Sequence, residues 1–401
     1  MTVHIIGAGL AGMAAAVRLA QKGQSVIVHE ATAHGGGRCR SMFDSTLDRR
    51  INNGNHLMLS GNVETMAYLR AIDSLDSLSI AKRAVFSFLD LENDERWQVK
   101  PGWLMRVPGC SVLDNLAGLK LAWAGENTTV ADVFDASRAV YRKLWEPLSV
   151  SVLNTAADEA SAQLLWPVLK QTFGRGEKAC LPCIAGQGLS ASFIGPAILE
   201  LHEKDSLVQF NRRLQSLNLD KYQALSLIFG DDEVVLEADD KVILAVPGDV
   251  AGTLLPGLSH PDQFRAIVNA HFVLPEVRND VGFLGLVGGV SQWLFVRGDV
   301  ASVTVSAADD LAAKSAEEIA AILWAEISKA LELKDVPIPL YRIIKEKRAT
   351  FAQTPQQVRL RPGTQTRWSN VSLAGDWTAT GLPATIEGAI TSGHRAADVI
   401  C

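Results

Sequence analysis

The chain lacks the long apolar runs that cross membranes and the blocks of positive charge that bind nucleic acids. None of its apolar runs reaches the roughly 18 residues that indicate a transmembrane helix. Lys and Arg together number 38 against 44 Asp and Glu, which gives a formal net charge of -6. This acidic balance gives no reason to expect nucleic acid as a partner. With 401 residues and no repeats or low-complexity segments, the sequence predicts a globular protein of two lobes.

Cysteine is also scarce, with five residues scattered along the chain. Cys180 and Cys183 form a Cys-x-x-Cys pair that would suit a redox or zinc site. Because no second pair stands at ligand spacing, we predict an ordinary loop and no metal. A strand is predicted from residue 3, which leaves no room for a presequence. We therefore expect a cytoplasmic protein.

The N-terminal segment has the glycine pattern of a dinucleotide site. A predicted strand over 3–6 leads into Gly7-x-Gly9-x-x-Gly12, and a helical stretch follows. Gly7 permits a tight turn, and Gly9 lets the backbone approach a pyrophosphate. Gly12 lets the helix pack close to the strand. The pattern therefore predicts a strand–turn–helix unit with a phosphate at the turn.

The residues after this turn complete the expected half-site. The pyrophosphate is expected at free N–H groups of the helix N-terminus, at Leu10 and Ala11, where the helix dipole favours its charge. A second predicted strand, over 25–29, ends at Glu30. A carboxylate there can accept hydrogen bonds from the adenosine ribose, and it would repel the 2′-phosphate of NADP.

A glycine-rich loop after Glu30 distinguishes FAD from NAD. It reads Gly35-Gly36-Gly37-Arg38, and an acid followed at this spacing by Gly-Gly-Arg resembles the flavoprotein family of amine oxidases, protoporphyrinogen oxidases and phytoene desaturases. The glycines let the loop lie close under the pyrophosphate, and Arg38 supplies a charge against it.

The C-terminal segment resembles the other half of the same site. A predicted apolar strand ends at Gly375-Asp376, and a helix begins near Thr385 and Ile386. In the resembling family the aspartate bonds the ribitol chain, and N–H groups of the last helix face the pyrimidine edge of the flavin. A helix N-terminus stabilises the negative charge that a reduced flavin carries there. No second GxGxxG is visible for a nicotinamide, so FAD is favoured.

The two half-sites at opposite ends of the chain predict an α/β fold. It would have an FAD-binding Rossmann-like lobe with an inserted α+β substrate lobe, as in amine oxidase-like two-domain proteins. We assign residues 1–58, 181–250 and 366–401 to the FAD-binding domain and residues 59–180 and 251–365 to the substrate-binding domain.

Hydrophobic periodicity gives the expected elements. Residues 59–180 are predicted to be mostly helical, with a break at Pro147. The helices are expected over 62–69, 112–123, 131–145, 160–173, 189–204 and 316–331. Strands are expected over 207–210, 224–229 (in a hairpin), 241–247 and much of 266–307.

Several further stretches resemble one group within the family, the hydroxysqualene dehydroxylases. They are Asn53-Gly54-Asn55-His56-Leu57-Met58-Leu59, Trp145-Glu146-Pro147-Leu148, Gln292-Trp293-Leu294-Phe295 and the run from Gly375 to Ala389. The resemblance covers essentially the full length. One departure is that Asn52 stands where the family usually has an acid, which puts in doubt any mechanism that needs a carboxylate there.

The resemblance implies removal of the hydroxyl group of hydroxysqualene to give squalene, a precursor of hopanoids. Turning C–OH into C–H needs two electrons, which reduced FAD can deliver as a hydride. It also needs a general acid for the leaving hydroxyl group and a dry site that protects the allylic cation from water.

Candidate catalytic groups are His56 and Glu146. His56 would donate to the leaving oxygen or hold the flavin edge, or else be a structural histidine bonded to backbone. Glu146 would be an acid or a helix cap. Trp293, Phe295 and Trp377 would line a hydrocarbon tunnel or belong to the core.

The expected cofactor contacts combine both half-sites with the Asn53 segment and one residue after the 207–210 strand. They are Gly7, Gly9, Leu10, Ala11, Gly12, Glu30, Gly36, Gly37, Arg38, Asn53, Gly54, Leu214, Gly375, Asp376, Thr385 and Ile386.

Two other functions stay open on the sequence alone. One is a desaturase or amine oxidase that takes hydride from another polyprenyl or amine substrate. The other is a flavin-binding subunit without turnover. The electron donor is unknown.

A squalene-like substrate resides in the bilayer, so we also expect a weak peripheral membrane contact at the inner face of the membrane. The candidate segment runs from Lys100 through Trp103, Leu104 and Met105 to Pro108, and on into 112–123. It combines aromatic and aliphatic groups with cations, which suits an interfacial patch, although the same pattern fits a core helix.

Overall fold

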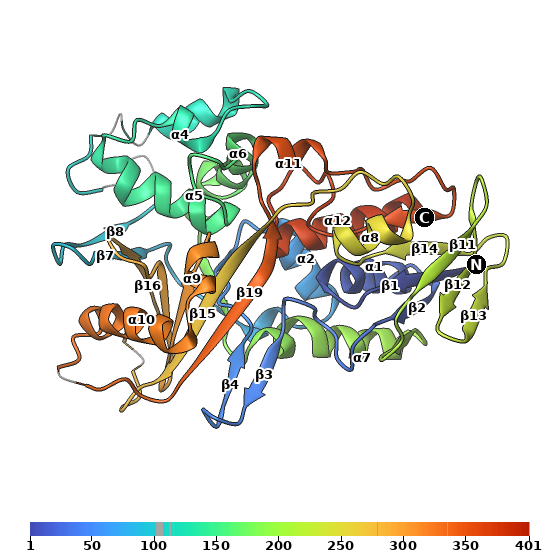
Figure 1. Cartoon of the computed structure of the whole chain (residues 1–401), viewed down its shortest axis with the longest axis horizontal. Helices are drawn as coiled ribbons and strands as arrows, with labels where there is room; N and C mark the ends of the chain where they lie inside the picture. The colour runs from blue at the N-terminus through green and yellow to red at the C-terminus, as the bar shows by residue number, and fades with distance from the viewer. Residues whose placement is uncertain (102–106, 112–113, 115, 279, 335, 401) are drawn as a thin grey trace.

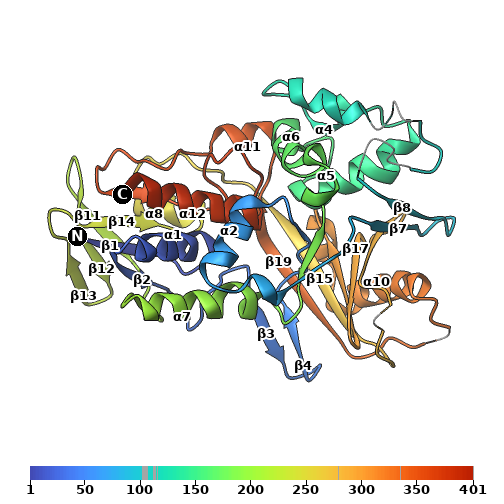
Figure 2. The ribbon, with the colours of Figure 1, turned by 180° about the vertical axis from the view of Figure 1, so that it is seen from behind.

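The protein has two lobes, and the chain passes between them several times. The computed structural model describes residues 1–101, 107–111, 114, 116–278, 280–334 and 336–400. One lobe holds both chain ends around a parallel sheet (Figure 1). The other joins a long mixed sheet to a group of helices (Figure 2).

The first lobe is built on five parallel strands, of which β1 (Thr2–Ile6), β14 (Lys241–Leu244) and β20 (Val371–Leu373) are almost entirely buried because both faces of the sheet are covered there. In β1, Val3 and Ile5 point to one layer, and His4 and Ile6 point to the other. In spatial order the strands are β10 (Leu207–Gln209), β2 (Ser25–His29), β1, β14 and β20.

Helices cover one face of this sheet, and a helix with a small sheet covers the other. The first layer is α1 (Leu10–Gln21), α2 (Val63–Ala71), α7 (Gly195–Glu203) and α12 (Ile386–Ile400). The second layer is α8 (Gly248–Leu254) with β11 (Ser216–Leu219), β12 (Ala224–Phe229) and β13 (Asp232–Val235). The crossover α1 joins β1 to β2, which places its N-terminus at the carboxyl ends of the strands.

The second lobe is built on a seven-stranded sheet, antiparallel except where β16 pairs with β7. Its order is β19 (Tyr341–Phe351), β15 (Phe264–Val273), β18 (Val300–Val305), β17 (Trp293–Arg297), β16 (Phe283–Val287), β7 (Phe86–Asp90) and β8 (Arg96–Val99). Helix α10 (Ala316–Ala330) packs on one face, and aromatic side chains cover part of the other.

Short helices stand above the aromatic part of the sheet (Figure 1). They are α4 (Val130–Val133), α5 (Glu146–Leu153) and α6 (Ala162–Gln171). The remaining elements are α9 (Asp309–Ala313), α11 (Pro355–Arg359), the hairpin β3 (Ser41–Asp44) and β4 (Arg49–Asn52), and a small sheet of β5 (Met58–Leu59), β9 (Pro182–Ala185) and β6 (Leu78–Ile80).

The predicted fold class is confirmed, and several predicted elements lie where expected. Helix α10 begins at Ser315 with a capping box to Glu318, and the 224–235 hairpin forms as β12 and β13. Helices α2 and α6 fall within the predicted ranges 62–69 and 160–173 to within about two residues. The 189–204 helix is a π-helical turn over Ser190–Ile194 that continues as α7.

The prediction of a mostly helical segment over 59–180 is wrong in part. It contains β6, β7 and β8, and the last two extend the large sheet by alternating buried with exposed side chains. The predicted helix over 131–145 is broken after Val133, and a π-helical turn over Tyr141–Trp145 runs into α5. Pro147 does not break the chain: the helical backbone is continuous from the π-helical turn into α5, and this widened turn directly before the proline accommodates its missing N–H.

The domain boundaries stay a prediction, and core packing bears on one of them. Met66, Tyr68 and Leu69 of α2 and Leu78 of β6 share one core with α1 and α12. This packing favours a first boundary near residue 80 rather than residue 58. Within the described part of the chain, no helix has both the length and the apolar composition needed to span a bilayer.

Candidate functional site

The glycine turn after β1 has the backbone geometry of a phosphate cradle. Gly7 adopts a φ of +107°, and a Cβ there would lie 2.6 Å from the carbonyl oxygen of Ala245. A Cβ at Gly12 would lie 1.9 Å from the carbonyl oxygen of Gly7, so the helix packs directly on the turn. A Cβ at Gly9 would meet no atom within 4 Å. The two outer glycines are therefore required for packing, and the middle one leaves open space.

Helix α1 begins at this open space without a capping side chain. Its N-cap is Gly9, which has no side chain to accept the first N–H groups. The N–H groups of Leu10, Ala11 and Gly12 have no partner within the helix. These residues therefore fit a pyrophosphate, which would accept their hydrogen bonds and complement the helix dipole.

The Glu30 carboxylate lies beside the glycine turn. One oxygen accepts a hydrogen bond of 2.8 Å from the N–H of Ala8, and the other accepts bonds of 2.8 Å from the N–H and hydroxyl of Thr32. The carboxylate therefore also braces the turn. Leu214 is 7% exposed and packs in the core of this lobe, two residues after Arg212, whose N–H bonds the Glu30 carbonyl at 2.8 Å.

The Gly-Gly-Arg loop folds back onto the glycine turn. Gly36 donates its N–H to the carbonyl of Ala8 at 2.7 Å and forms a parallel bridge with Gly9. Gly36 and Gly37 have φ values of +104° and +55°, which favour glycine. The loop therefore packs on the Gly7–Gly12 turn, and its contact with a pyrophosphate stays a prediction.

Arg38 joins the two ends of the chain. Its Nη2 donates to both carboxylate oxygens of Asp376 at 2.8 Å, and Nη1 donates to the carbonyl of Ala349. The Asp376 charge raises the pKa of the Arg38 guanidinium. The structure thus brings together the predicted half-sites, although Arg38 is bonded here to Asp376. Its predicted contact with the pyrophosphate stays a prediction.

The loop after Asp376 is shaped for the start of α12. Gly375 has a φ of +149° and donates its N–H to the Ser392 hydroxyl at 2.8 Å. The Thr385 hydroxyl accepts the N–H of Gly388 at 3.1 Å, which caps the helix. The N–H of Ile386 has no partner within the helix, and its predicted contact with the flavin stays a prediction.

Two buried side chains that the sequence analysis missed hold this loop. Arg361 donates to the carbonyl oxygens of Leu382 and Asp376, at 2.9 and 3.0 Å. Gln353 is fully buried and accepts the N–H of Ala384 at 2.9 Å. Burial lowers the pKa of Arg361 to about 10. Neither residue stands in a recognisable motif, and one sequence gives no sign that a polar side chain will be buried.

The segment from Asn53 to His56 rests on a polar network at the end of the large sheet. Asn269 donates to the carbonyl of Asn53 at 3.1 Å and accepts from Thr304 at 2.7 Å. Thr304 in turn accepts from Asn55 at 3.2 Å. Since Asn53 donates to the carbonyl of Arg38 at 3.2 Å, this network continues into the Gly-Gly-Arg loop.

His56 lies within this group and is neutral at physiological pH. Burial, and then the Arg38 charge, lower the pKa of His56 to about 4. Its Nε2 lies 3.7 Å from the position that a Cβ on Gly54 would take. A neutral imidazole can donate one N–H bond, but it is not the strong acid that an imidazolium would be.

The carboxylate beside the Asn53 segment is not the predicted one. Glu146 is exposed at the start of α5, and partial desolvation raises its pKa. Its charged neighbours are Arg142 and Asp158, so the structure does not bring it together with His56. Glu346 on β19 was missed, although its Oε2 lies 3.4 Å from the Asn53 amide nitrogen.

Asn52 lies apart from this group because its side chain faces another part of the chain. It accepts hydrogen bonds from the Ser41 hydroxyl at 2.7 Å and the Leu189 N–H at 3.2 Å. The acid expected at this position is therefore replaced by a residue that joins backbone segments.

The predicted aromatic residues fall into two places. Trp293 and Phe295 lie on the large sheet, opposite Thr304 and Ser302, and both contact Phe283. Trp377 lies instead in the core of the first lobe, where its Nε1 donates to the Val246 carbonyl at 2.9 Å. The first two stand beside the polar network, and Trp377 does not.

Comparison with known proteins identifies the family. The model of the flavin-containing amine oxidoreductases matches residues 10–276 and 296–401. The chain belongs to this family. Within the flavin-containing amine oxidoreductases it is 45% identical to a hydroxysqualene dehydroxylase of Rhodopseudomonas palustris, over 100% of this chain and 98% of that protein.

A second hydroxysqualene dehydroxylase, from Sinorhizobium fredii, is 43% identical over 99% of this chain and 97% of its own length. The predicted resemblance to this group is therefore confirmed. A solved double mutant of putrescine oxidase has a TM-score of 0.72 at 18% identity over 100% of this chain and 99% of that one, so the two chains share a fold.

Proposed function

We propose that this protein is an FAD-dependent hydroxysqualene dehydroxylase that converts hydroxysqualene to squalene. The observation that carries the proposal is the identity of 42–45% with three such enzymes along at least 99% of this chain. The paired half-sites, joined through Arg38 and Asp376, supply the flavin position that this reaction needs.

The cofactor is FAD, held without a covalent bond. An adenosine half is indicated by the Gly7–Gly12 cradle with Glu30, and a flavin half by Asp376 and the start of α12. Cys39 is buried behind the Gly36 turn, and burial raises the pKa of its thiol to about 12, which does not suit attachment. Acid precipitation should leave the yellow FAD in the supernatant, whereas flavin in the pellet would contradict non-covalent binding.

The net reaction needs a hydride and a proton: R–OH + H⁺ + H⁻ gives R–H + H₂O. A bound reduced flavin supplies the hydride. The protein must hold the hydroxyl group, deliver the proton and keep water from the allylic cation.

The residues beside the proposed flavin position can divide these tasks. Neutral His56 can donate a hydrogen bond to the hydroxyl oxygen. Glu346 places a carboxyl group 3.4 Å from the Asn53 amide nitrogen, and we expect it to deliver the proton. The cluster of Trp293, Phe295 and Phe283 presents an apolar wall next to Thr304, where it would exclude water.

The test is substrate-dependent reoxidation of the flavin. After anaerobic bleaching with dithionite, hydroxysqualene should restore the absorbance of oxidised flavin, and Glu346→Gln should slow this step by roughly 10²-fold or more. A flavin that is reduced but never reoxidised by hydroxysqualene would instead indicate a subunit without this activity.

We further infer a weak peripheral contact with the membrane. Of the predicted contact segment, residues 102–106, 112–113 and 115 lie outside the described residues. In its described part, Leu116, Leu119 and Trp123 are 47%, 51% and 81% exposed. A Trp with two Leu residues on the surface suits the boundary between headgroups and acyl chains.

A further inference from the structure

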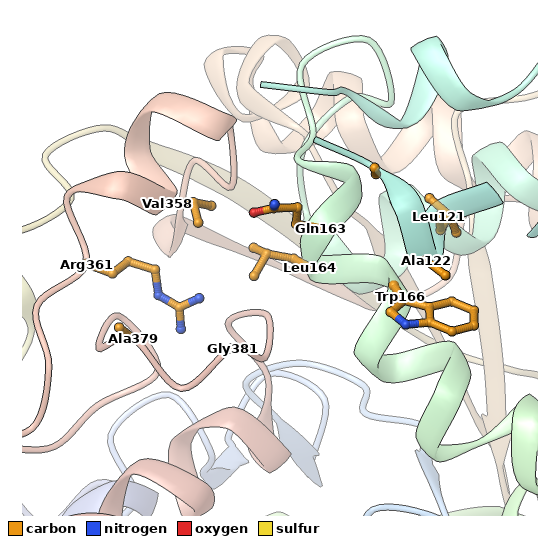
Figure 3. A pocket seen from close by; sticks show the side chains of 10 residues that line it. Leu121, Ala122, Gln163, Leu164, Trp166, Val358, Arg361, Ala379 and Gly381 are labelled. Atoms are coloured by element: carbon orange, nitrogen blue, oxygen red, sulfur yellow. The ribbon is translucent and has the colours of Figure 1, made fainter. Parts of the chain in front are cut away.

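A cavity of about 470 Å³ opens between the second lobe and the loop that follows Asp376. Figure 3 shows its walls. Gln163, Leu164 and Trp166 of α6 form one wall, and Val358 of α11 stands opposite. The loop residues Ala379 and Gly381 close one side. The cavity is within the usual range of ligand pockets, about 300 to 1,000 Å³.

Among the described residues, the cavity lining is mainly apolar and carries one charged group, the Arg361 guanidinium, which already has hydrogen-bond partners. The Arg361 guanidinium bonds the Leu382 and Asp376 carbonyls and the Thr380 hydroxyl, so its N–H groups point into the loop. Only its Nε lacks a partner. The remaining surface is aliphatic and aromatic except for the Gln163 amide. An anionic head would find little to bind here, whereas a hydrocarbon would bury apolar surface worth about 25 cal/mol per Å².

The cavity touches both the flavin loop and the exposed apolar face. Ala379 and Gly381 follow Asp376 in the loop that Arg361 fixes. On the opposite side the cavity is lined by Leu121 and Ala122 of the short 3-10 helix Ala117–Trp123, which also carries exposed Leu119 and Trp123. This helix therefore separates the cavity from the surface where we place the lipid contact.

We propose that this cavity binds the hydrocarbon chain of the polyprenyl alcohol, in the part distant from the reacting carbon. The inference rests on the proposed function, because that function supplies a substrate with a long apolar chain. It adds a site that selects for chain length: a C30 alcohol reaches the cavity, and a C10 allylic alcohol does not.

The test uses a substitution that places a large side chain in the cavity from an exposed lining residue. Ala122→Trp adds bulk at the rim without disturbing a buried side chain, and Ala136→Trp is the matched control at an exposed alanine of the same lobe outside the cavity. Turnover of hydroxysqualene and of geraniol is measured anaerobically in detergent micelles, with dithionite reducing the flavin again after each cycle. In Ala122→Trp the ratio of kcat/KM for hydroxysqualene over geraniol should fall at least tenfold, mainly through KM, while Ala136→Trp should leave it unchanged. An unchanged ratio in Ala122→Trp would overturn the proposal.

Equilibrium binding of radiolabelled squalene separates this proposal from the proposed function. Ala122→Trp should weaken binding at least fivefold relative to the wild type and Ala136→Trp, whether or not the reaction occurs. If the wild type forms no squalene but Ala122→Trp still loses binding, the proposed function fails and the cavity assignment stands. If squalene binds equally to all three proteins, the cavity assignment is wrong.

Discussion

At the scale of single residues, the proposed flavin site combines charged side chains with the backbone of the Gly7–Gly12 turn. The Glu30 carboxylate both faces the expected ribose and holds the N–H of Ala8 at 2.8 Å. Removing it therefore affects the ligand and the turn together. Glu30→Gln separates the two effects, since an amide oxygen can still accept the Ala8 N–H while the charge is lost.

We expect Glu30→Ala and Arg38→Ala each to weaken FAD binding by roughly 1.5–3 kcal/mol, because each removes charged hydrogen bonds. This corresponds to about a tenfold to hundredfold rise in Kd. Titration of apoprotein with FAD measures it, and Arg40→Ala, two residues from Arg38, is the control. An FAD affinity equal to that of the wild type in both variants, with the fold intact, would contradict the site assignment.

Buried histidines predict acid sensitivity. Burial lowers the pKa of His271 to about 4 and that of His29 to about 3, from an ordinary 6.5. Between pH 6.5 and about pH 4 the unfolded chain therefore binds more protons than the folded one. The free energy of unfolding is highest above pH 6.5 and falls as the pH drops toward 4.

Because its pKa is lowered in the folded state, each of these histidines should reduce the free energy of unfolding by on the order of 1–2 kcal/mol at pH 5 relative to pH 7. Chemical denaturation at the two pH values measures the loss. His271→Asn should reduce the slope between them, even if it lowers stability at pH 7. A slope equal to that of the wild type would show that His271 is not held neutral.

At the scale of elements, the start of α12 is positioned by a segment distant from it in sequence. Gln353 accepts the N–H of Ala384 and donates to the carbonyl of Leu153 at 2.6 Å. It thereby fixes the loop before α12 to α5. We propose that the N–H groups at the α12 N-terminus face the flavin edge, so the position of this helix should affect the cofactor.

Gln353→Ala should raise the Kd for FAD about tenfold and lower the flavin reduction potential, because the helix N-terminus stabilises the reduced anion less well. Gln357→Ala is the matched control: Gln357 is also a buried glutamine, but it bonds Asp262. Potentiometric titration measures the change. Equal potentials in the two variants would mean that Gln353 has only a structural role.

The elements that the sequence predicted well are those with local signals. The Gly7–Gly12 turn, the helix over 316–331 and the hairpin that begins with the 224–229 strand each depend on a few neighbouring residues, and each forms close to where it was predicted. Strand β7 joins the large sheet through β16, which lies almost 200 residues further along the chain, so no local signal showed its place there. Strand β8 pairs with β7 alone, in a hairpin that the sequence analysis missed. The sequence did not predict Arg361, Gln353 and Glu346 as site residues, because their contacts are with other segments of the chain that only the fold brings near them.

At the scale of the whole molecule, the lobes place an apolar surface, a hydrocarbon-sized cavity and the flavin loop in succession. The surface residues Leu119 and Trp123 lie on the same short helix as Leu121 of the cavity wall. A net charge of -6 disfavours strong attraction to anionic lipid, so membrane binding should be weak and reversible.

In liposome flotation, Leu119→Ser/Trp123→Ser should float at most a third as much protein as the wild type, because it loses two apolar anchors. Leu199→Ser/Val235→Ser removes two apolar side chains of similar exposure from the first lobe, 66% and 70%, and should float like the wild type. Equal flotation of all three proteins would place the membrane contact elsewhere.

The most direct test of the account is a single turnover with product analysis. Enzyme with its FAD reduced is mixed anaerobically with hydroxysqualene, and the extracted lipid is separated by gas chromatography with mass detection. The account predicts squalene in an amount equal to the flavin that becomes oxidised. Oxidised flavin without squalene, or hydroxysqualene recovered unchanged beside reduced flavin, would contradict it.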